Sequence, residues 1–193
     1  MRVSVIVVAL GLVVFALLPI FPRTETASTE IHPQAQPQRL LGEGAGTRPA
    51  GGGVGPTVMK ISIPRLGLKD VPVPDGSTQS ELDKIGIMHL SGTGYPWQKG
   101  SNTFIVGHRL GYLWTRTPYA FYRLNKMKPG DRIVIERGGK TYTFRVYDRI
   151  IVRPDDYWVT YPVPGRTTVS LQTCTPIPTF QYRLIVRGEL VSS

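Results

Sequence analysis

The only thiol in this 193-residue chain is Cys174, in the segment VSLQTCTP. It ends a strand-like apolar run and is followed by Thr175 and Pro176, and proteins display reactive groups mainly at such strand ends. A thiolate at this position would be a nucleophile for acyl transfer. The alternative is a buried small hydrophobic residue, a role for which cysteine is well suited.

Two histidines compete to be the proton carrier for this nucleophile. His108 follows an apolar run and a glycine in TFIVGHRL, so it lies at a strand exit as Cys174 does. His89, in IGIMHLSGTG, also lies at a strand end. Imidazole exchanges protons near neutral pH, and an imidazolium beside a thiol enlarges the thiolate fraction. The residues alone leave both histidines as candidates.

Arg183 follows Cys174 by nine residues and lies on the next predicted strand. If residues 176–181 form a connecting loop, the two side chains can lie side by side on neighbouring strands. A guanidinium there could stabilise a thiolate or an oxyanion and donate to the carbonyls of a peptide substrate. The alternative is an ordinary surface arginine.

The sequence predicts neither a metal site nor a cofactor site. The three histidines (His32, His89 and His108) are scattered, and one cysteine excludes an intrachain disulfide and an all-thiolate site. Asp155 and Asp156 could bind a cation, although two solvated loop carboxylates are the simpler interpretation. No Gly-rich phosphate loop, H-E-x-x-H or G-x-S-x-G sequence occurs.

From residue 58 onward, short apolar runs broken by Gly, Pro and Asp predict seven or eight strands, typical of an all-β barrel or sandwich. The stretch 131–147 passes through Gly138-Gly139 and predicts a hairpin. Helical signals are weak. The apolar runs behind this count are 58–63, the brief 71–73 and 86–89, 103–106, 131–136, 141–147, 150–152, 167–173 and 182–190, with short helices at 78–84 and 119–124.

The first 57 residues differ in composition from the rest. Residues 3–21 are uncharged and as a helix would be about 28 Å long, close to the roughly 30 Å hydrocarbon core of a membrane. Because they end in no good A-x-A site, we expect residues 1–23 to be an uncleaved membrane anchor, with a cleaved secretory signal as the alternative. Residues 24–57, rich in Pro, Gly, Thr, Gln and Ala, predict a linker, so 58–193 would be one domain outside the cytoplasm.

The net charge of +10 is concentrated in the predicted domain. Residues 58–193 hold 19 Lys and Arg side chains against ten Asp and Glu, which leaves +9. These basic residues are spread singly, and neither a basic run nor a nucleic-acid-binding module is visible. We therefore expect a solvated basic face, or attraction to an anionic cell envelope, and no nucleic-acid partner.

Three motifs together resemble the sortases, the cysteine transpeptidases of Gram-positive cell surfaces: VGHR with His108, SLQTC with Cys174, and RLIVRGEL, which begins with Arg183. Their order and spacing behind an apolar segment and a linker make the combination specific, and the likeness runs from about Met59 to Leu190. Ser170 stands where the family usually has Thr. The S-G-T-G stretch and the TCTP…RLIV ending are most similar to class E, with classes D and F as alternatives, and residues 110–119 match none of these classes.

The resemblance implies an eight-stranded sortase-type β-barrel with one or two short helices. It implies that Cys174 cleaves an LPxTG- or LAxTG-type sorting signal between Thr and Gly through a thioacyl intermediate. An amine of a cell-wall precursor or a pilin would then accept the protein. His108 would be the general acid and base, Arg183 would position substrate and stabilise the oxyanion, and His89 matches a non-catalytic position. No cofactor is implied.

The resemblance also implies partners and a location. The partners would be surface proteins with C-terminal sorting signals, and the enzyme would be a single-pass protein of the cell membrane with an extracellular catalytic domain.

Two other functions remain open at this point. One is a secreted cysteine peptidase that uses the same Cys/His pair and transfers the acyl group to water. The other is a non-enzymatic, membrane-tethered basic β-domain that binds envelope polymers or nucleic acid, which would show salt-sensitive binding and no thiol reactivity.

Overall fold

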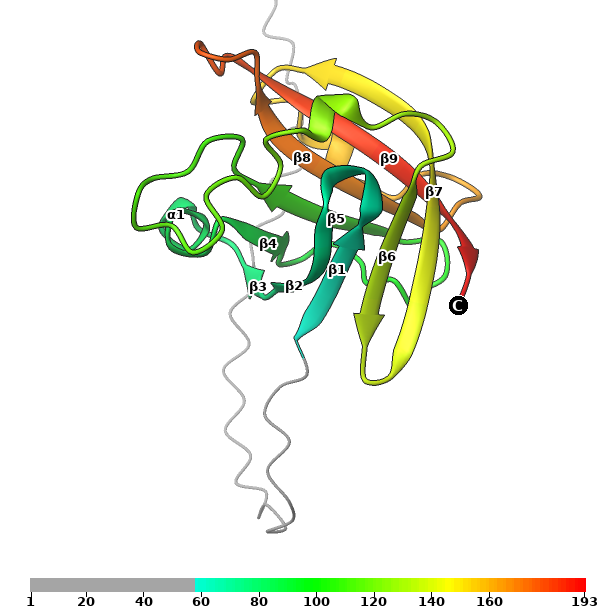
Figure 1. The fold of residues 1–193 in the computed structure, drawn as a ribbon. Coiled ribbons are helices and arrows are strands. Elements are labelled where there is room, and N and C mark those ends of the chain that lie inside the picture. Colours follow the sequence, from blue (N-terminus) through cyan, green and yellow to red (C-terminus); the bar gives the residue numbers. More distant parts are fainter. Residues whose placement is uncertain (1–57) are drawn as a thin grey trace, which may run out of the picture. The chain divides into compact units, whose positions relative to one another are not determined.

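The computed structural model describes residues 58–193, whose strands form a single nine-stranded sheet (Figure 1). The segments expected to be an anchor (1–23) and a linker (24–57) lie outside the described residues. Among residues 58–193, no helix has the length and apolar character needed to cross a membrane.

The sheet has the strand order β2-β1-β6-β7-β9-β8-β5-β4-β3. Neighbouring strands are antiparallel except for two pairs, β5 with β8 and β3 with β4. Edge strand β2 also packs against β4, next to the opposite edge, so the sheet curls into a nearly closed barrel. In chain order the strands are β1 (Met59–Ile63), β2 (Leu68–Val73), β3 (Asp75–Gly76), β4 (Ile87–Leu90), β5 (Asn102–Gly107), β6 (Arg132–Arg137), β7 (Lys140–Val152), β8 (Thr168–Thr175) and β9 (Tyr182–Ser192).

The expected all-β barrel is confirmed, with differences in detail. Nine strands are present where eight were expected, because the two-residue β3 pairs with β4. The run 150–152 is no separate strand but the end of the long β7. The hairpin expected at 131–147 is formed by β6 and β7, and Gly138 and Gly139 both have positive φ (58° and 77°), as a two-residue hairpin turn requires.

The helix expected at 119–124 is wrong. The chain there makes turns that lead into a short 3-10 helix, η2 (Leu124–Lys126). Phe121, Leu124 and Met127 are all fully buried, and their spacing of three residues fits the three residues per turn of 3-10 geometry. Two further 3-10 helices are η1 (Pro64–Leu66) and η3 (Tyr157–Thr160).

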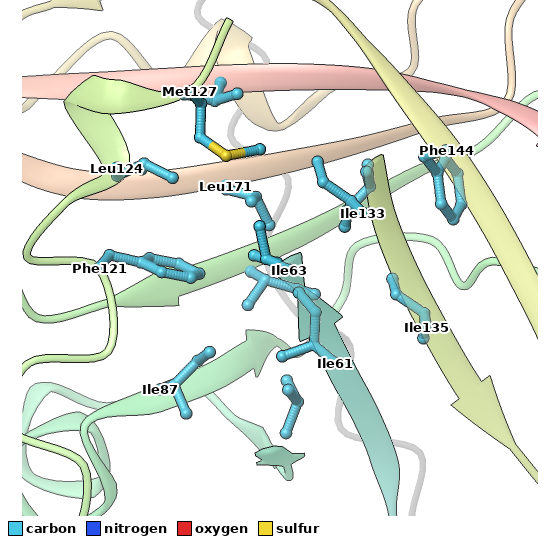
Figure 2. Close-up of a cluster of buried hydrophobic side chains, with 14 of the residues drawn as sticks. Ile61, Ile63, Ile87, Phe121, Leu124, Met127, Ile133, Ile135, Phe144 and Leu171 are labelled. Atoms are coloured by element: carbon cyan, nitrogen blue, oxygen red, sulfur yellow. The ribbon is translucent and has the colours of Figure 1, made fainter. Parts of the chain in front are cut away.

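The barrel interior is filled by branched aliphatic and aromatic side chains from strands on all sides. Figure 2 shows Phe121 and Met127 beside residues of β1, β4, β6, β7 and β8. Truncating a fully buried phenylalanine such as Phe121 or Phe144 typically costs about 3–5 kcal/mol. The cluster therefore fixes the relative positions of the strands that carry the candidate site.

The described residues contain one α-helix, α1 (Gln79–Ile85), which a capping box begins. The amide of Glu81 donates to Thr78 Oγ1, and Glu81 Oε2 accepts from the amides of Ser77 and Thr78. Gly86 ends the helix at φ 91°, in the left-handed region. These caps make a seven-residue helix stable in a chain with weak helical propensity.

The capping carboxylate predicts a pH-dependent contribution to stability. The backbone N–H of Ser77, and then the hydroxyl and amide of Thr78, lower the pKa of Glu81 by favouring its ionised form. The contribution is therefore present above the unfolded-state pKa and is lost as pH falls through the lower folded-state value. We expect Glu81→Gln to have a lower thermal midpoint than wild type at pH 7 and the same thermal midpoint at pH 2.5, as measured by circular dichroism. Glu136→Gln, which removes another exposed carboxylate, is the control and should show no such convergence.

Candidate active site

The strands β5, β8 and β9 have two apolar faces. One face, with Ile105 and Leu171, lines the main core. The other face, with Val106 and Ile185, belongs to a second buried cluster that is covered by the loop 153–167 between β7 and β8 through Val159. Because side chains alternate along a strand, Cys174 and Arg183 share this second face, and so does the position of His108 just beyond β5.

Strand register brings the three predicted site residues together. Cys174 is the direct cross-strand partner of Arg183, as the expected loop 176–181 predicted. In the parallel pair β5–β8, Val106 lies opposite Gln172. Continuing that register by two residues places His108 beside Cys174, and we call these two residues the dyad.

Two buried side-chain hydrogen bonds hold the strand ends on either side of the dyad. Thr173 Oγ1 donates to the carbonyl of Gly107 at 2.8 Å, just before it. Arg109 Nη1 donates to Thr175 Oγ1 at 3.0 Å, just after it. Each bond joins residues 66 positions apart, so the parallel pairing is maintained beyond the last backbone pair of the ladder.

Gly107 is required by close packing against the core. A Cβ atom there would lie 2.5 Å from Cδ2 of Phe121, which is closer than atoms can approach. The missing side chain therefore lets the aromatic ring pack directly against the strand end that carries His108.

Asp83 on α1 is the partner of His108, and sequence analysis did not identify it. Its Oδ1 lies 3.1 Å from His108 Nε2 and also accepts from Gln79 Nε2 at 2.7 Å. The imidazole is largely buried, with 12% of its side chain exposed. A carboxylate at one ring nitrogen fixes the orientation of the ring and leaves the other nitrogen for proton exchange. No sequence signal links the two residues, which are 25 positions apart.

We expect Asp83→Asn to lower kcat about tenfold, a part of what general acid–base catalysis contributes. KM should change little, because Asp83 does not line the apolar hollow described below. Steady-state kinetics with a sorting-signal peptide, the substrate that the resemblance implies, measure both constants. Asp70→Asn is the matched control, since asparagine also tolerates the positive φ of 52° found there. An unchanged kcat in Asp83→Asn would contradict the role given to this carboxylate.

Arg183 is oriented by the turn that joins β8 to β9. Its Nη1 donates to the carbonyls of Phe180 and Tyr182, both at 3.1 Å. These bonds hold the guanidinium at the strand end beside Cys174, whose side chain is partly buried. A fixed positive charge at this place favours negative charge on a thiolate or an oxyanion.

His89 has a different environment from His108. It is fully buried, its Nδ1 lies 2.7 Å from Asp75 Oδ1, and its Nε2 lies 3.0 Å from the carbonyl of Gly94. Tyr95 donates its hydroxyl to the same carboxylate at 3.0 Å. Burial, and then this hydrogen bond, raise the pKa of Tyr95, so the phenol remains a donor. Both ring nitrogens of His89 are thus engaged in joining β3, β4 and the following loop.

A hollow of about 210 Å³, which we call the apolar hollow after its aliphatic residues, lies on the face of the sheet that the dyad shares, although neither His108 nor Cys174 lines it. Gln172, two residues before Cys174 on the same face, lines it. Its walls come from α1 and the residues before it, β4, β5 and the loop 153–167. They combine apolar residues (Leu82, Met88, Leu90, Phe104, Val106 and Val159) with polar and charged ones (Ser77, Thr78, Gln79, Arg153, Asp156 and Thr160). A larger hollow of about 600 Å³ lies at the opposite end of β8 and β9, near Thr167 and Leu190, and is remote from the thiol.

Asn102, also missed by sequence analysis, ties the loop 153–167 to the sheet. Its side chain is buried, and Nδ2 donates to the carbonyls of Val159 (3.1 Å) and Tyr161 (3.2 Å). Its Oδ1 accepts from the hydroxyls of Thr168 (3.1 Å) and Ser170 (2.8 Å). Serine at position 170, where the resembled family usually has threonine, keeps this contact, because both side chains supply a hydroxyl.

The described residues contain no cluster of three or more His, Cys, Asp or Glu side chains that could hold a metal ion. The pair considered for a cation interacts with a neighbouring arginine instead. Asp155 lies 3.6 Å from Arg153 Nε, and Asp156 accepts from the Arg153 amide at 2.7 Å.

Comparisons with known proteins agree with this geometry. The model of the Sortase domain family matches residues 61–191. Sortase SrtE1 of Streptomyces coelicolor is 31% identical over 144 residues, which are 68% of this chain and 39% of that protein, so the chain spans about two fifths of this relative's length.

Solved sortase structures have the same fold. The lid mutant of sortase A from Corynebacterium diphtheriae superposes with a TM-score of 0.63 at 30% identity, covering 72% of each chain. Sortase C-1 from Actinomyces oris gives 0.63 at 32% identity, covering 72% of this chain and 77% of that one. Since the family model matches residues 61–191, which include all or part of every strand and the full set of candidate site residues, the chain belongs to the sortase family.

Proposed function

We propose that this chain is a membrane-anchored sortase that cleaves an LPxTG- or LAxTG-type signal between Thr and Gly and transfers the protein to an amine. The observation that carries the proposal is the shared face of Cys174, His108 and Arg183 at the ends of three adjacent strands. This arrangement supplies a nucleophile, a proton carrier and a fixed positive charge at one place.

The first half-reaction is acylation. The thiolate of Cys174 attacks the carbonyl carbon of the signal's threonine, and the negative charge that develops on the carbonyl oxygen is stabilised by Arg183. As the C–N bond to glycine breaks, the imidazolium of His108 gives its proton to the leaving amine. The products are a thioester on Cys174 and the free C-terminal fragment.

The second half-reaction is the transfer. An acceptor amine attacks the thioester carbonyl, His108 takes a proton from the amine, and the thiolate leaves. His108 regains the proton that it gave in the first half-reaction, so the enzyme returns to its starting state. His108 Nδ1 is the nitrogen for this exchange, because Asp83 occupies Nε2.

The apolar hollow beside Gln172 supports a peptide substrate whose residues before the scissile bond include small apolar side chains. Its aliphatic residues can pack against a leucine side chain of such a signal. The loop 153–167 forms one wall, so the position of this loop sets the fit.

Class and location are further parts of the proposal. Similarity to Sortase SrtE1 supports class E and hence an LAxTG-type signal, with classes D and F as alternatives. The apolar run 3–21 and the composition of 24–57 support a single membrane anchor, a linker and an extracellular catalytic domain. The acceptor would be an amine of a cell-wall precursor or a pilin.

Mass spectrometry of the products tests this function. The enzyme is incubated with LAxTG and LPxTG peptides and an excess of an amine such as triglycine. We expect an amine-capped product and a thioacyl adduct on Cys174. Free acid alone, even at high amine concentration, would show a cysteine peptidase instead.

Arg183→Lys keeps the charge but loses the bidentate donor geometry, and should slow both half-reactions.

A further inference from the structure

The loop between β5 and η2 displays a group of large apolar side chains to solvent. The side chain of Leu113 is fully exposed, and those of Trp114 and Tyr112 are 71% and 49% exposed. The rings of Tyr112 and Trp114 stack with their centroids 4.7 Å apart and their planes 1° apart. We call residues 112–114 the apolar tip. Single exposed hydrophobic residues are common, but three consecutive ones call for an explanation.

The apolar tip stands on an ordered base. Thr115 is buried, its hydroxyl donates to the Asp83 carbonyl at 2.6 Å, and it accepts from the Tyr112 amide at 3.0 Å. The amide of Gly111 donates to the Pro118 carbonyl at 2.6 Å and closes the loop. The tip is therefore held outward by its base and by α1.

The surroundings of the apolar tip are basic. Arg116, two residues after Trp114, is exposed, and its amide donates to the carbonyl of Lys84, also exposed, at 3.0 Å. Arg123 and Lys126 are exposed farther along the same connection. The carboxylate of Asp83, whose backbone carbonyl accepts from Thr115, lies against His108.

We propose that the apolar tip inserts into the interfacial layer of an anionic lipid bilayer. Trp and Tyr favour that layer, Leu enters the acyl boundary, and Lys84 and Arg116 complement anionic headgroups. Residues 24–57 predict a coil that spans roughly 30 Å behind an apolar segment. A bilayer is thus the surface that the tip meets at the highest effective concentration, so a weak contact is sufficient.

The role of this lipid contact in catalysis depends on the proposed function. Tyr112 lies edge-on to His108, with the ring centroids 6.2 Å apart. Insertion of the tip would therefore place the dyad next to the membrane surface. A substrate still attached to the same bilayer would be met there with its signal close to the lipid.

The test uses the full chain in phosphatidylcholine–phosphatidylglycerol vesicles brominated at a shallow acyl position. We expect the lipid to quench one of the chain's three tryptophans, and we expect Trp114→Phe to abolish that quenching. Leu113→Asp should reduce the quenching at least about fivefold, because a carboxylate is costly in the interface. Val191→Asp places the same charge on another exposed apolar residue, 56% exposed and at the far end of β9, and should leave quenching unchanged.

Any other result overturns the proposal. The proposal is wrong if the chain does not float with the vesicles, or if the fluorescence of Trp114→Phe is quenched by the lipid as strongly as that of wild type. It is also wrong if a signal peptide, rather than lipid, protects the fluorescence of Trp114 from a water-soluble quencher. The quenching does not depend on catalysis, so it separates this proposal from the proposed function. In an active enzyme, Leu113→Asp should slow transfer of a vesicle-anchored substrate several-fold and leave transfer of a soluble peptide unchanged.

Discussion

Cys174→Ala is expected to lower transfer of a sorting-signal peptide to an amine by at least about 1,000-fold, because the covalent route is lost. His108→Ala should cost about as much, and the double variant should be no slower than either single one, since the two residues act as one unit. A continuous assay with a quenched fluorescent peptide measures all three rates.

Two further measurements control this result. The thermal midpoint of Cys174→Ala should stay close to wild type, because the side chain is small and only partly buried. As Cys174 is the only thiol, the rate of iodoacetamide labelling reports its reactivity in the wild type, and His108→Ala should slow it. A Cys174→Ala protein with wild-type activity would refute the mechanism, and an unreactive thiol in the folded protein would favour the non-enzymatic alternative.

Asn102→Ala is expected to reduce the free energy of unfolding by about 2–4 kcal/mol, because it leaves buried donors and acceptors without partners. Two hydroxyls on β8 lose their acceptor, and two carbonyls of the loop 153–167 lose their donor. Since that loop walls the apolar hollow, KM for the signal peptide should rise more than kcat falls. Urea unfolding and steady-state kinetics measure the two effects.

Asn102→Asp separates the two halves of this network. It keeps the shape and the acceptor for Thr168 and Ser170, but it places an oxygen against the carbonyls of Val159 and Tyr161. We expect a loss of stability at pH 7 similar to that of Asn102→Ala, whereas Ser170→Ala, which removes one hydroxyl, should cost only about 1 kcal/mol. If Asn102→Ala changed neither stability nor KM, the network would not position the loop.

Several elements could be predicted because their information is local. Gly138 and Gly139 provide the positive φ values of the β6–β7 turn, and the segment around Glu81 predicts the helix that the structure shows as α1. The pairing of β8 with β9 could be predicted in the same way, because a short connection joins neighbouring antiparallel strands. It is this pairing that places Arg183 beside Cys174.

Contacts between distant segments could not be predicted in this way. The parallel pairing of β5 with β8 joins residues 66 positions apart, and a one-residue shift would turn His108 to the other face. The segment 119–124 was expected to be a short helix, but the chain there forms turns that lead into the 3-10 helix η2.

The sequence by itself determined which chemistry is available: one thiol at a strand end, a histidine at another, and an arginine one hairpin away. Only the tertiary structure decided which groups support that chemistry. It showed Asp83 as the partner of His108 and Asn102 as the tether of the loop that walls the hollow. The reason is physical: residue type and local periodicity specify strands and turns, whereas barrel closure and strand register decide which distant side chains meet.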